Sequence, residues 1–421
     1  MFNLTNQLNH EQPQIMHIDL NSAFASIEQQ AHPSLRHRPI GITNRLSKNC
    51  CLIALSYEAK QQGVKVGMGL QEVKTIIPNI IVLESDPPKY HYVYQQLLRI
   101  MQYYSPKVKM KSIDEGIIDF HNTPTMLRHQ ALTNIAFNIK QAVKNQIGHY
   151  ITVNIGIAPN QFLAKLASSL HKPDGLDIID YNNLISTYKQ LQLTDLPGIA
   201  KHYTARLNAV QIYQPLDFLQ ASSQTLKNLV FKSIIGEDWY QRLRGYEVDD
   251  VTTQLGQIGR QWVLDRPTNQ TNKLNSYLQF LCQTTGIKMR YKNVDARGIL
   301  VWLIFTNHEH WLKRKMFKSS FFSDHDIYTK ALYVFNQRPN LTVQTIGITC
   351  YQLQKTSRNQ LSLLDQINQT NNLTSAIDTI NHQYGNFQIT TANTLKVQDK
   401  IKQKIPFGSI EYFDLLLEAN S

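Results

Sequence analysis

The sequence predicts a mixed α+β protein of several domains, and three observations support this fold class. At 421 residues the chain is longer than one hydrophobic core usually extends. Residues 14–157, once 32–105 are set aside, alternate strand-like and helical runs in the order β-α-β-β-α-β, and residues 251–351 repeat that order. A helical stretch separates the two. We therefore expect two split βαβ sheets that flank a helical domain.

The first sheet is predicted from hydrophobic spacing. Its strands are predicted at 14–20, 107–113, 116–120 and 151–157, and its helices at 22–30, 132–143 and 160–170. Pro33 ends the first helix, and Asn160 is a suitable N-cap for the last one. A split βαβ order places the first strand beside the third, and we expect the two helices of that order, 22–30 and 132–143, on one face.

The inserted stretch and the second sheet are predicted in the same way. The insert has a strand-like run at 50–55 and helical runs at 57–62 and 90–103. In the second sheet the predicted strands are 251–263, 298–305, 311–317 and 343–351, and the helices are 274–291 and 327–335.

Two Gly-containing turns in the helical stretch indicate contact with phosphate. Residues 196–199 (Leu-Pro-Gly-Ile) and 234–237 (Ile-Ile-Gly-Glu) resemble helix-hairpin-helix turns, which aim backbone N–H groups at a phosphate near a helix N-terminus. Ala200 lies where a second Gly is usual, so the first turn is expected to hold phosphate less firmly.

The formal net charge of +12 favours polyanionic partners. Eight Lys and Arg residues lie between Lys288 and Lys318, against only Asp295 and Glu309. Nucleic acid is therefore the expected polyanion. The alternative interpretation is a basic face that is merely solvated.

Composition also limits where the protein acts. No apolar stretch reaches the roughly 20 residues that a membrane span requires, and the N-terminal residues lack the layout of a signal peptide. Cys50, Cys51, Cys282 and Cys350 show no metal-ligand spacing and no disulfide framework. We expect a cytoplasmic monomer with reduced thiols and no membrane contact.

Three acidic residues at the ends of predicted strands are the candidate catalytic groups. Asp19 closes the first strand, and Asp114 and Glu115 lie at a predicted turn before Gly116. Acidic side chains among apolar strands are costly unless cations neutralise them. Hard divalent ions prefer oxygen ligands, so we expect two Mg²⁺ ions, roughly 3.5–4 Å apart, to hold the attacking and leaving oxygens of a phosphoryl displacement. Nucleotidyl transfer is the leading hypothesis.

A simpler interpretation of the same residues stays open. Asp19 could be only a helix N-cap, and Asp114 and Glu115 only an exposed turn.

The motifs of the chain resemble those of the Y-family (translesion) DNA polymerases over nearly its whole length. Ser112-Ile113-Asp114-Glu115 is the most specific of them. The resembling segments, in chain order, are 19–28, 56–68, 112–115, 156–175, 196–199 and 258–260. Six motifs in the family's order make coincidence an inadequate explanation.

The resemblance implies a right-hand polymerase fold with a split βαβ palm. The implied domains are a palm at 1–31 and 84–180, small inserted fingers at 32–83, a helix-hairpin-helix thumb at 181–250, a second βαββαβ domain (the little finger) at 251–355, and a C-terminal tail at 356–421.

The resemblance also implies a reaction. Asp19, Asp114 and Glu115 would be the catalytic metal carboxylates that hold two Mg²⁺ ions, with the backbone carbonyl of Leu20 completing one site. The implied function is template-directed, error-tolerant DNA synthesis, which adds dNTPs to a primer 3′-hydroxyl on primer–template DNA and bypasses damaged template bases.

Four more residues would contact the incoming nucleotide. Tyr57, Lys60 and Lys172 match the family's triphosphate contacts. Phe24 matches the steric gate, whose ring leaves no room for a ribose 2′-hydroxyl.

Several positions depart from the family pattern. Ala23 replaces an aromatic residue before the gate, and Lys60 replaces the more usual Arg, whose planar fork Lys lacks. Ala54 lies where a hydroxyl residue is frequent. Asn21, in place of a second Asp, is more similar to the catalytic subunit of bacterial DNA polymerase V than to DNA polymerase IV. No metal carboxylate is lost, so we expect an active enzyme.

A short apolar motif lies beyond the second sheet. Gln360, Leu361, Ser362, Leu363 and Leu364 resemble the bacterial sliding-clamp-binding motif, in which apolar anchors enter a groove on the clamp. A sliding clamp is therefore an expected partner.

Two other functions stay open. A catalytically weak, DNA-binding accessory subunit in DNA repair would keep the fold and bind primer–template without incorporation. A nucleotidyl cyclase would share the split βαβ sheet and paired acidic ligands, but the helix-hairpin-helix turns and the clamp-like motif disfavour it.

Overall fold

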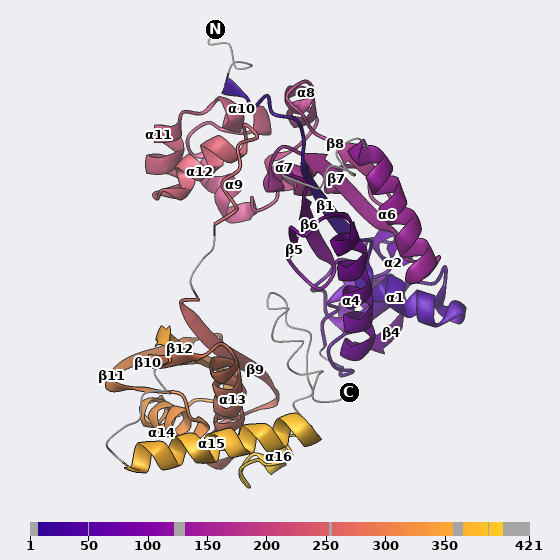
Figure 1. The fold of residues 1–421 in the computed structure, drawn as a ribbon. Helices are drawn as coiled ribbons and strands as arrows, with labels where there is room; N and C mark the ends of the chain where they lie inside the picture. The colour runs from indigo at the N-terminus through magenta and orange to yellow at the C-terminus, as the bar shows by residue number, and fades with distance from the viewer. Residues whose placement is uncertain are drawn as a thin grey trace. The chain divides into compact units, whose positions relative to one another are not determined.

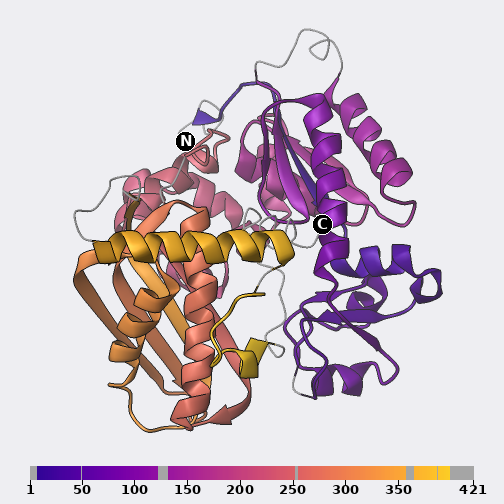
Figure 2. The same cartoon turned by 60° about the horizontal axis from the view of Figure 1, so that its bottom comes forward.

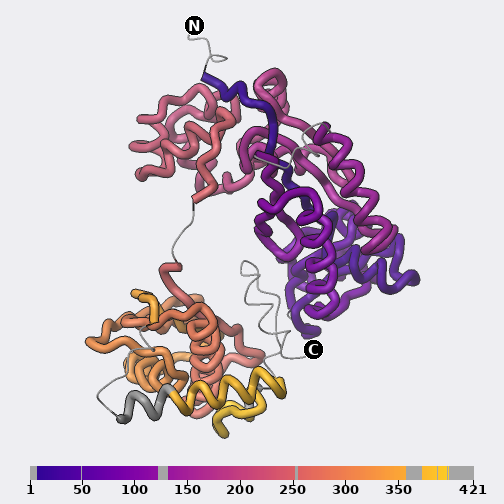
Figure 3. Tube along the Cα trace, viewed as in Figure 1, coloured from indigo at the N-terminus to yellow at the C-terminus, as the bar shows by residue number. Residues whose placement is uncertain are grey.

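The computed structural model describes residues 7–48, 50–121, 131–251, 255–356, 365–385 and 387–398. The chain divides after Val251 into two compact units (Figures 1 and 3). Each unit has its own hydrophobic core. The mixed α+β prediction is confirmed. The first unit has one five-stranded and one three-stranded sheet, and the second has a four-stranded sheet.

The five-stranded sheet of the first unit has its predicted first strand in the middle. Its strands, in spatial order, are β5 (Val108–Met110), β6 (Glu115–Asp119), β1 (Ile15–Leu20), β7 (Val153–Ala158) and β8 (Leu176–Ile178). β1 is antiparallel to both β6 and β7. The predicted adjacency of the first and third strands of the βαββαβ order, β1 and β6, is confirmed.

Helices cover both faces of this sheet, because the helix predicted at 160–170, which follows the βαββαβ order, lies opposite the helix of the inserted stretch. Gly116 pairs with Ile18 and faces α4 (Pro87–Tyr104), because an added Cβ there would lie 2.9 Å from Met101 Cε. The next side chain along β1, His17, points the opposite way and contacts Ser168 of α7 (Gln161–Leu170) at 2.9 Å.

The predicted helix 22–30 exists but does not serve mainly as a cover for the five-stranded sheet. This helix, α1 (Ala23–Ala31), packs chiefly on α4 and on the smaller sheet. α4 comes from the inserted stretch and packs against β5, β6 and α6 (Leu132–Gln146).

The inserted stretch forms a small sheet with its own core. Its elements are η2 (Pro33–Leu35), β2 (Ile40–Thr43), β3 (Ala54–Leu55), α2 (Tyr57–Gln61), α3 (Leu70–Ile76) and β4 (Ile81–Glu84), with strand order β3-β2-β4. The predicted strand 50–55 is reduced to two residues, whereas β2, β4 and α3 were not predicted.

The rest of the first unit is helical, as predicted. Its elements are α8 (Leu184–Lys189), η3 (Leu193–Asp195), α9 (Lys201–Asn208), α10 (Pro215–Gln220), α11 (Ser223–Thr225), η4 (Leu226–Phe231) and α12 (Ile235–Arg242). Gly198, with φ of +91°, forms the predicted turn before α9. The second predicted turn lies about two residues earlier, at 232–234, and Gly236 is the second residue of α12, where an added Cβ would lie 2.4 Å from Lys227 Cα.

The second unit confirms all six predicted elements. They are β9 (Gln257–Thr268), α13 (Thr271–Tyr291), β10 (Val294–Phe305), β11 (His310–Phe321), α14 (Asp324–Phe335) and β12 (Val343–Lys355). The sheet is antiparallel with order β11-β10-β12-β9. Its first strand therefore lies at an edge, whereas β1 is central in the other sheet, although both units follow the same order along the chain.

Part of the predicted C-terminal tail is folded against the second unit (Figure 2). It comprises α15 (Asp365–Tyr384) and α16 (Leu395–Gln398). Buried Arg290 of α13 donates to both carboxylate oxygens of Asp378 in α15, at 2.6 and 2.8 Å, and to Asp324 at 2.7 Å. Residues 360–364, the clamp-like motif, lie outside the described residues.

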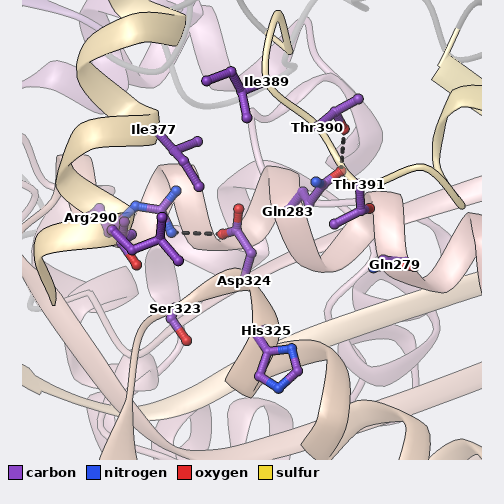
Figure 4. Close-up of a pocket in the computed structure, with 12 residues that line it drawn as sticks. Gln279, Gln283, Arg290, Ser323, Asp324, His325, Ile377, Ile389, Thr390 and Thr391 are labelled. Atoms are coloured by element: carbon purple, nitrogen blue, oxygen red, sulfur yellow. Dashed lines mark hydrogen bonds and ion pairs between the residues drawn. The ribbon is translucent and has the colours of Figure 1, made fainter. Parts of the chain in front are cut away.

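α15 does not fill all the space beneath it. A cavity of about 370 Å³ lies among α13, the start of α14, α15 and the segment 389–391 (Figure 4). The Arg290–Asp324 ion pair lines it, together with Gln283, whose side-chain oxygen accepts from the Thr390 hydroxyl at 3.2 Å.

Two features of the described residues bear on where the protein acts. No helix among these residues is both long enough and apolar enough to cross a membrane. The four cysteines are free thiols, and Cys282 and Cys350 are buried.

Candidate active site

The three acidic residues predicted as metal ligands lie together at one end of the five-stranded sheet. Asp19 in β1 is the register partner of Glu115 in β6. Asp114 lies just before β6, and its carbonyl oxygen accepts a hydrogen bond from the Leu20 N–H at 2.9 Å. The Lys111 N–H closes the preceding turn by donating to the Glu115 carbonyl at 2.9 Å. This turn lets Asp114 and Glu115 both lie near Asp19.

Two basic side chains contact the Glu115 carboxylate. Lys165 of α7 donates to its two oxygens at 2.9 and 2.8 Å. The buried His17 ring lies 3.4 Å from one of them through Nε2. Burial alone would raise the pKa of Glu115, but the nearby His17 ring and the hydrogen bonds and charge of Lys165 lower that pKa to about 2. Glu115 is therefore strongly stabilised as an anion.

Asp114 is shifted in the opposite direction. Burial raises the pKa of its carboxyl group; the hydroxyl of Ser112, which donates to Oδ1, opposes this effect, and the negative charges of Asp19 and Glu115 add to it. The site therefore has an excess of negative charge around Asp114, which a bound cation would relieve.

Asp19 accepts a hydrogen bond from Lys172. Each of the three carboxylates is thus bonded to a neighbouring side chain. Across the described part of the chain, no three His, Cys, Asp or Glu side chains are arranged as ligands of one metal ion. The donor set nevertheless fits a hard divalent cation, since three carboxylates with uncompensated charge at Asp114 are the chemistry such ions prefer. The lysine partners have flexible stems that can turn away from the carboxylates.

A cavity of about 270 Å³ adjoins the carboxylates and brings the predicted nucleotide contacts together. Its lining includes Asp19, Leu20, Ser22, Phe24, Ala54, Tyr57, Lys60, Asp114 and Lys172. All four predicted nucleotide contacts and two of the three carboxylates therefore face one space.

Ser22 organises the near side of this cavity. Its φ of +49° is in the left-handed region, so the chain turns sharply between β1 and α1. The Lys60 ammonium donates to its hydroxyl at 2.8 Å and lies 5.0 Å from the Tyr57 ring centre. Burial lowers the pKa of Lys60, and the nearby charge of Lys172 lowers it further. Two mutually repelling cations in one cavity are suited to binding an anion.

The ring of Phe24 is held from behind. It stacks on Tyr90 of α4, with ring centres 4.5 Å apart and an interplanar angle of 16°. The Tyr90 hydroxyl donates to Glu28 at 2.9 Å, and Lys89 donates to the other oxygen of Glu28 at 2.7 Å. Tyr90, Glu28 and Phe24 are all nearly fully buried. This packing fixes the position of the Phe24 ring at the cavity wall.

The predicted basic cluster lies only partly on the surface. Lys313, Arg314 and Lys318 are exposed on the edge strand β11. Arg290 is instead 8% exposed and paired with acidic groups, so this part of the prediction is wrong.

Sequence reasoning assigned no role to His17, Lys165 or Tyr90. Lys165 falls within a matched motif, which was the only available signal for it. His17 and Tyr90 act through contacts between segments far apart in the sequence, which spacing does not reveal.

Comparison with known proteins identifies the family. Residues 18–169 match the model of the impB/mucB/samB family, and residues 256–363 match the model of that family's C-terminal domain. Together they cover more than half of the chain. The chain belongs to the Y-family of DNA polymerases. Family membership implies the use of divalent metal ions.

Curated relatives of this family member include DNA polymerase IV from Staphylococcus aureus strains JH9 and MRSA252. Each is 26% identical over 357 residues, which are 84% of this chain and 99% of the relative. These relatives are DNA-directed DNA polymerases.

Solved structures share the fold. A Y-family DNA polymerase chimera of Dbh and Dpo4 is 24% identical with a TM-score of 0.67, over 80% of this chain and 98% of that one. DinB from Sulfolobus solfataricus is 23% identical with a TM-score of 0.52, over 82% and 99%. The Y-family polymerase fold includes a separate C-terminal antiparallel-sheet domain, the little finger, to which β9–β12 belong.

Proposed function

We propose that this chain extends DNA primers on a template by magnesium-dependent, two-metal nucleotidyl transfer, and that it bypasses damaged template bases. The observation that carries the proposal is the grouping of Asp19, Asp114 and Glu115 beside a cavity lined by cationic side chains, in a member of the Y-family. This arrangement favours an enzyme over a binding subunit, because Asp114 is under electrostatic strain that DNA binding alone would not require.

Metal chemistry would be supplied at the carboxylate end of the sheet. Asp19, Asp114, Glu115 and the Leu20 carbonyl would hold two Mg²⁺ ions, which activate the primer 3′-hydroxyl and neutralise charge on the leaving phosphates. The protein's own contribution is positioning: the β1–β6 register fixes Asp19 against Glu115, and the turn before β6 fixes Asp114.

The cavity residues would bind and select the nucleotide. Lys60, Lys172 and the Tyr57 hydroxyl would hold the triphosphate, whose charge relieves the repulsion between the two ammonium groups. Phe24, fixed by Tyr90, would exclude the 2′-hydroxyl of a ribonucleotide by occupying its space.

The domain assignment follows from the same family likeness. We assign the palm to 1–31 and 84–180, the fingers to 32–83, the thumb to 181–250 and the little finger to 251–355. The exposed Lys and Arg residues of β11 support contact between the little finger and the DNA backbone. Residues 360–364 would bind a sliding clamp, and we expect the protein to work as a monomer in the cytoplasm.

Primer extension tests the proposal. Wild-type protein with primer–template, dNTPs and Mg²⁺ should extend past an abasic site, and extension should fall by about a hundredfold or more in Asp114→Ala and in Glu115→Ala. Binding to primer–template should be retained in both variants. Tight binding without any incorporation by the wild type would instead indicate the accessory subunit, and a cyclic product from a nucleotide alone would indicate a cyclase.

A further inference from the structure

Lys172 lies in a short loop, residues 171–175, that joins α7 to β8. The side chain of Lys172 crosses from this loop to Asp19 and lines the cavity beside the carboxylates. A lysine has a long flexible stem, so the place its ammonium group can reach depends on how firmly its backbone is held.

One buried side chain holds both ends of the loop. Asn154 of β7, the register partner of Asp19, is completely buried. Its amide nitrogen donates to the His171 carbonyl at 3.2 Å, and its oxygen accepts from the Gly175 N–H at 3.2 Å. Gly175 is required for this closure, because an added Cβ would lie 2.1 Å from the His171 oxygen.

Two lysines of helix α6 hold the middle of the loop through Asp174. Lys140 of α6 donates to the carbonyl oxygen of Asp174 and, at 3.0 Å, to its carboxylate. Lys144, one turn later, donates to the other carboxylate oxygen at 3.2 Å. Asp174 has a φ of +58°, a left-handed conformation that costs free energy outside glycine and is sustained by such contacts.

Burial distinguishes Lys140 from a lysine in a surface ion pair. Lys140 is only 7% exposed, and its partner lies in the loop rather than on its own helix. Burying an ammonium group costs free energy unless the group is fully paired. The Lys140 ammonium group is paired with the backbone carbonyl oxygen and a carboxylate oxygen of Asp174.

We propose that Lys140 is a positioning residue for nucleotide binding, which acts with Asn154 by fixing the 171–175 loop so that Lys172 faces the incoming triphosphate. The inference rests on the proposed function, since it assigns a task to Lys172. Lys140 itself lies outside the cavity lining and acts only through the loop.

The expected signature is weaker nucleotide binding with little change in chemistry. If Lys172 holds the triphosphate equally in the ground and transition states, loosening its loop raises KM for dNTP and leaves kcat nearly unchanged. We expect Lys140→Met to raise KM about tenfold, since displacements near 1 Å at such contacts have effects of this order or larger. Lys140→Arg, which keeps the charge, should recover most of the loss.

A double-mutant comparison tests whether Lys140 acts through Lys172. KM and kcat are measured for the wild type, Lys140→Met, Lys172→Met and the double variant. Lys107→Met is the control, because it removes a more exposed ion pair of the same unit, with Asp119. In the Lys172→Met background, we expect Lys140→Met to raise KM for dNTP by less than about twofold. The reason is that both substitutions remove the same contact, that of Lys172 with the triphosphate. Equal effects in both backgrounds would overturn the proposal.

Binding is also measured without turnover, as the Kd of a dNTP for the complex with a dideoxy-terminated primer. Asp174→Asn removes the same ion pair by changing its more exposed partner. This variant replaces Lys140→Met in the test if Lys140→Met does not fold. It should raise this Kd by about threefold or more, and an unchanged Kd in a folded variant refutes the proposal. An inactive wild type would refute the proposed function instead, so the two failures are distinguishable.

Discussion

Replacement of Glu115 by Gln should destabilise the first unit, in addition to abolishing activity. Gln keeps the shape of the side chain but removes the charge that Lys165 and the buried His17 ring contact. The pKa of Glu115 is lowered from an ordinary 4.5 to about 2. A tenfold change in an acid dissociation constant corresponds to about 1.4 kcal/mol. The ionised Glu115 carboxylate therefore contributes roughly 3 kcal/mol to the free energy of unfolding at neutral pH.

The pH dependence has a definite sign. Because the folded-state pKa is the lower one, the contribution is present above about pH 4.5 and is lost as the pH falls towards 2. The stability difference between the wild type and Glu115→Gln should therefore be full at pH 7 and shrink steadily below pH 4.5. Asp114→Asn should act in the opposite sense, because burial and like charges raise the pKa of Asp114. Its loss should stabilise the metal-free protein at pH 7.

Hydrogen exchange of the β1 and β6 amides is the suitable assay, because it reports on the first unit separately from the second. Protein in EDTA is compared with Glu115→Gln, Asp114→Asn and the control Glu11→Gln, which changes an exposed carboxylate before β1. Faster exchange in Glu115→Gln and slower exchange in Asp114→Asn are expected. Equal exchange in all four proteins would refute the electrostatic description of the site.

Two further predictions concern contacts that support Phe24 and α15. Tyr90→Leu removes the ring stacked on Phe24. Aromatic pairs contribute about 0.5–1.5 kcal/mol, so the ratio of kcat/KM for dCTP over CTP should fall about two- to tenfold. An unchanged ratio would show that Phe24 needs no support. Asp378→Asn weakens the ion pair with buried Arg290, which should cost about 1–3 kcal/mol and speed hydrogen exchange in α15 while leaving β1 unaffected; uniform exchange across both units would contradict this assignment.

Elements with long hydrophobic patterns were predictable from the sequence. All six elements of the little finger follow from periodicity, because each of its strands and helices is long enough to show its repeat. The short strands β2, β3 and β4 have two to four residues and cannot show one. Their pairing is decided by contacts between distant segments, which no local pattern encodes.

Tertiary context also explains the errors. The turn predicted at Gly236 lies about two residues earlier, because the missing side chain of Gly236 lets the first turn of α12 approach the backbone of Lys227. Arg290 was counted with the basic surface, although it is buried between Asp324 and Asp378. Asp378 lies in the C-terminal segment that the sequence suggested was a tail. Counting charged residues gives the net charge of a segment. It does not show which of these side chains lie on the surface.

The candidate site was predictable in its acidic residues but not in its supporting contacts, and the difference has a physical cause. Acidic residues at strand ends violate the apolar pattern around them, so Asp19, Asp114 and Glu115 were conspicuous. The basic side chains that contact Glu115 do not break the pattern of their own elements: His17 keeps the alternation of β1, and Lys165 lies on the amphipathic helix α7. Chemistry that breaks a local rule can be found from sequence, whereas positioning that follows the rule becomes visible only when distant elements are brought together.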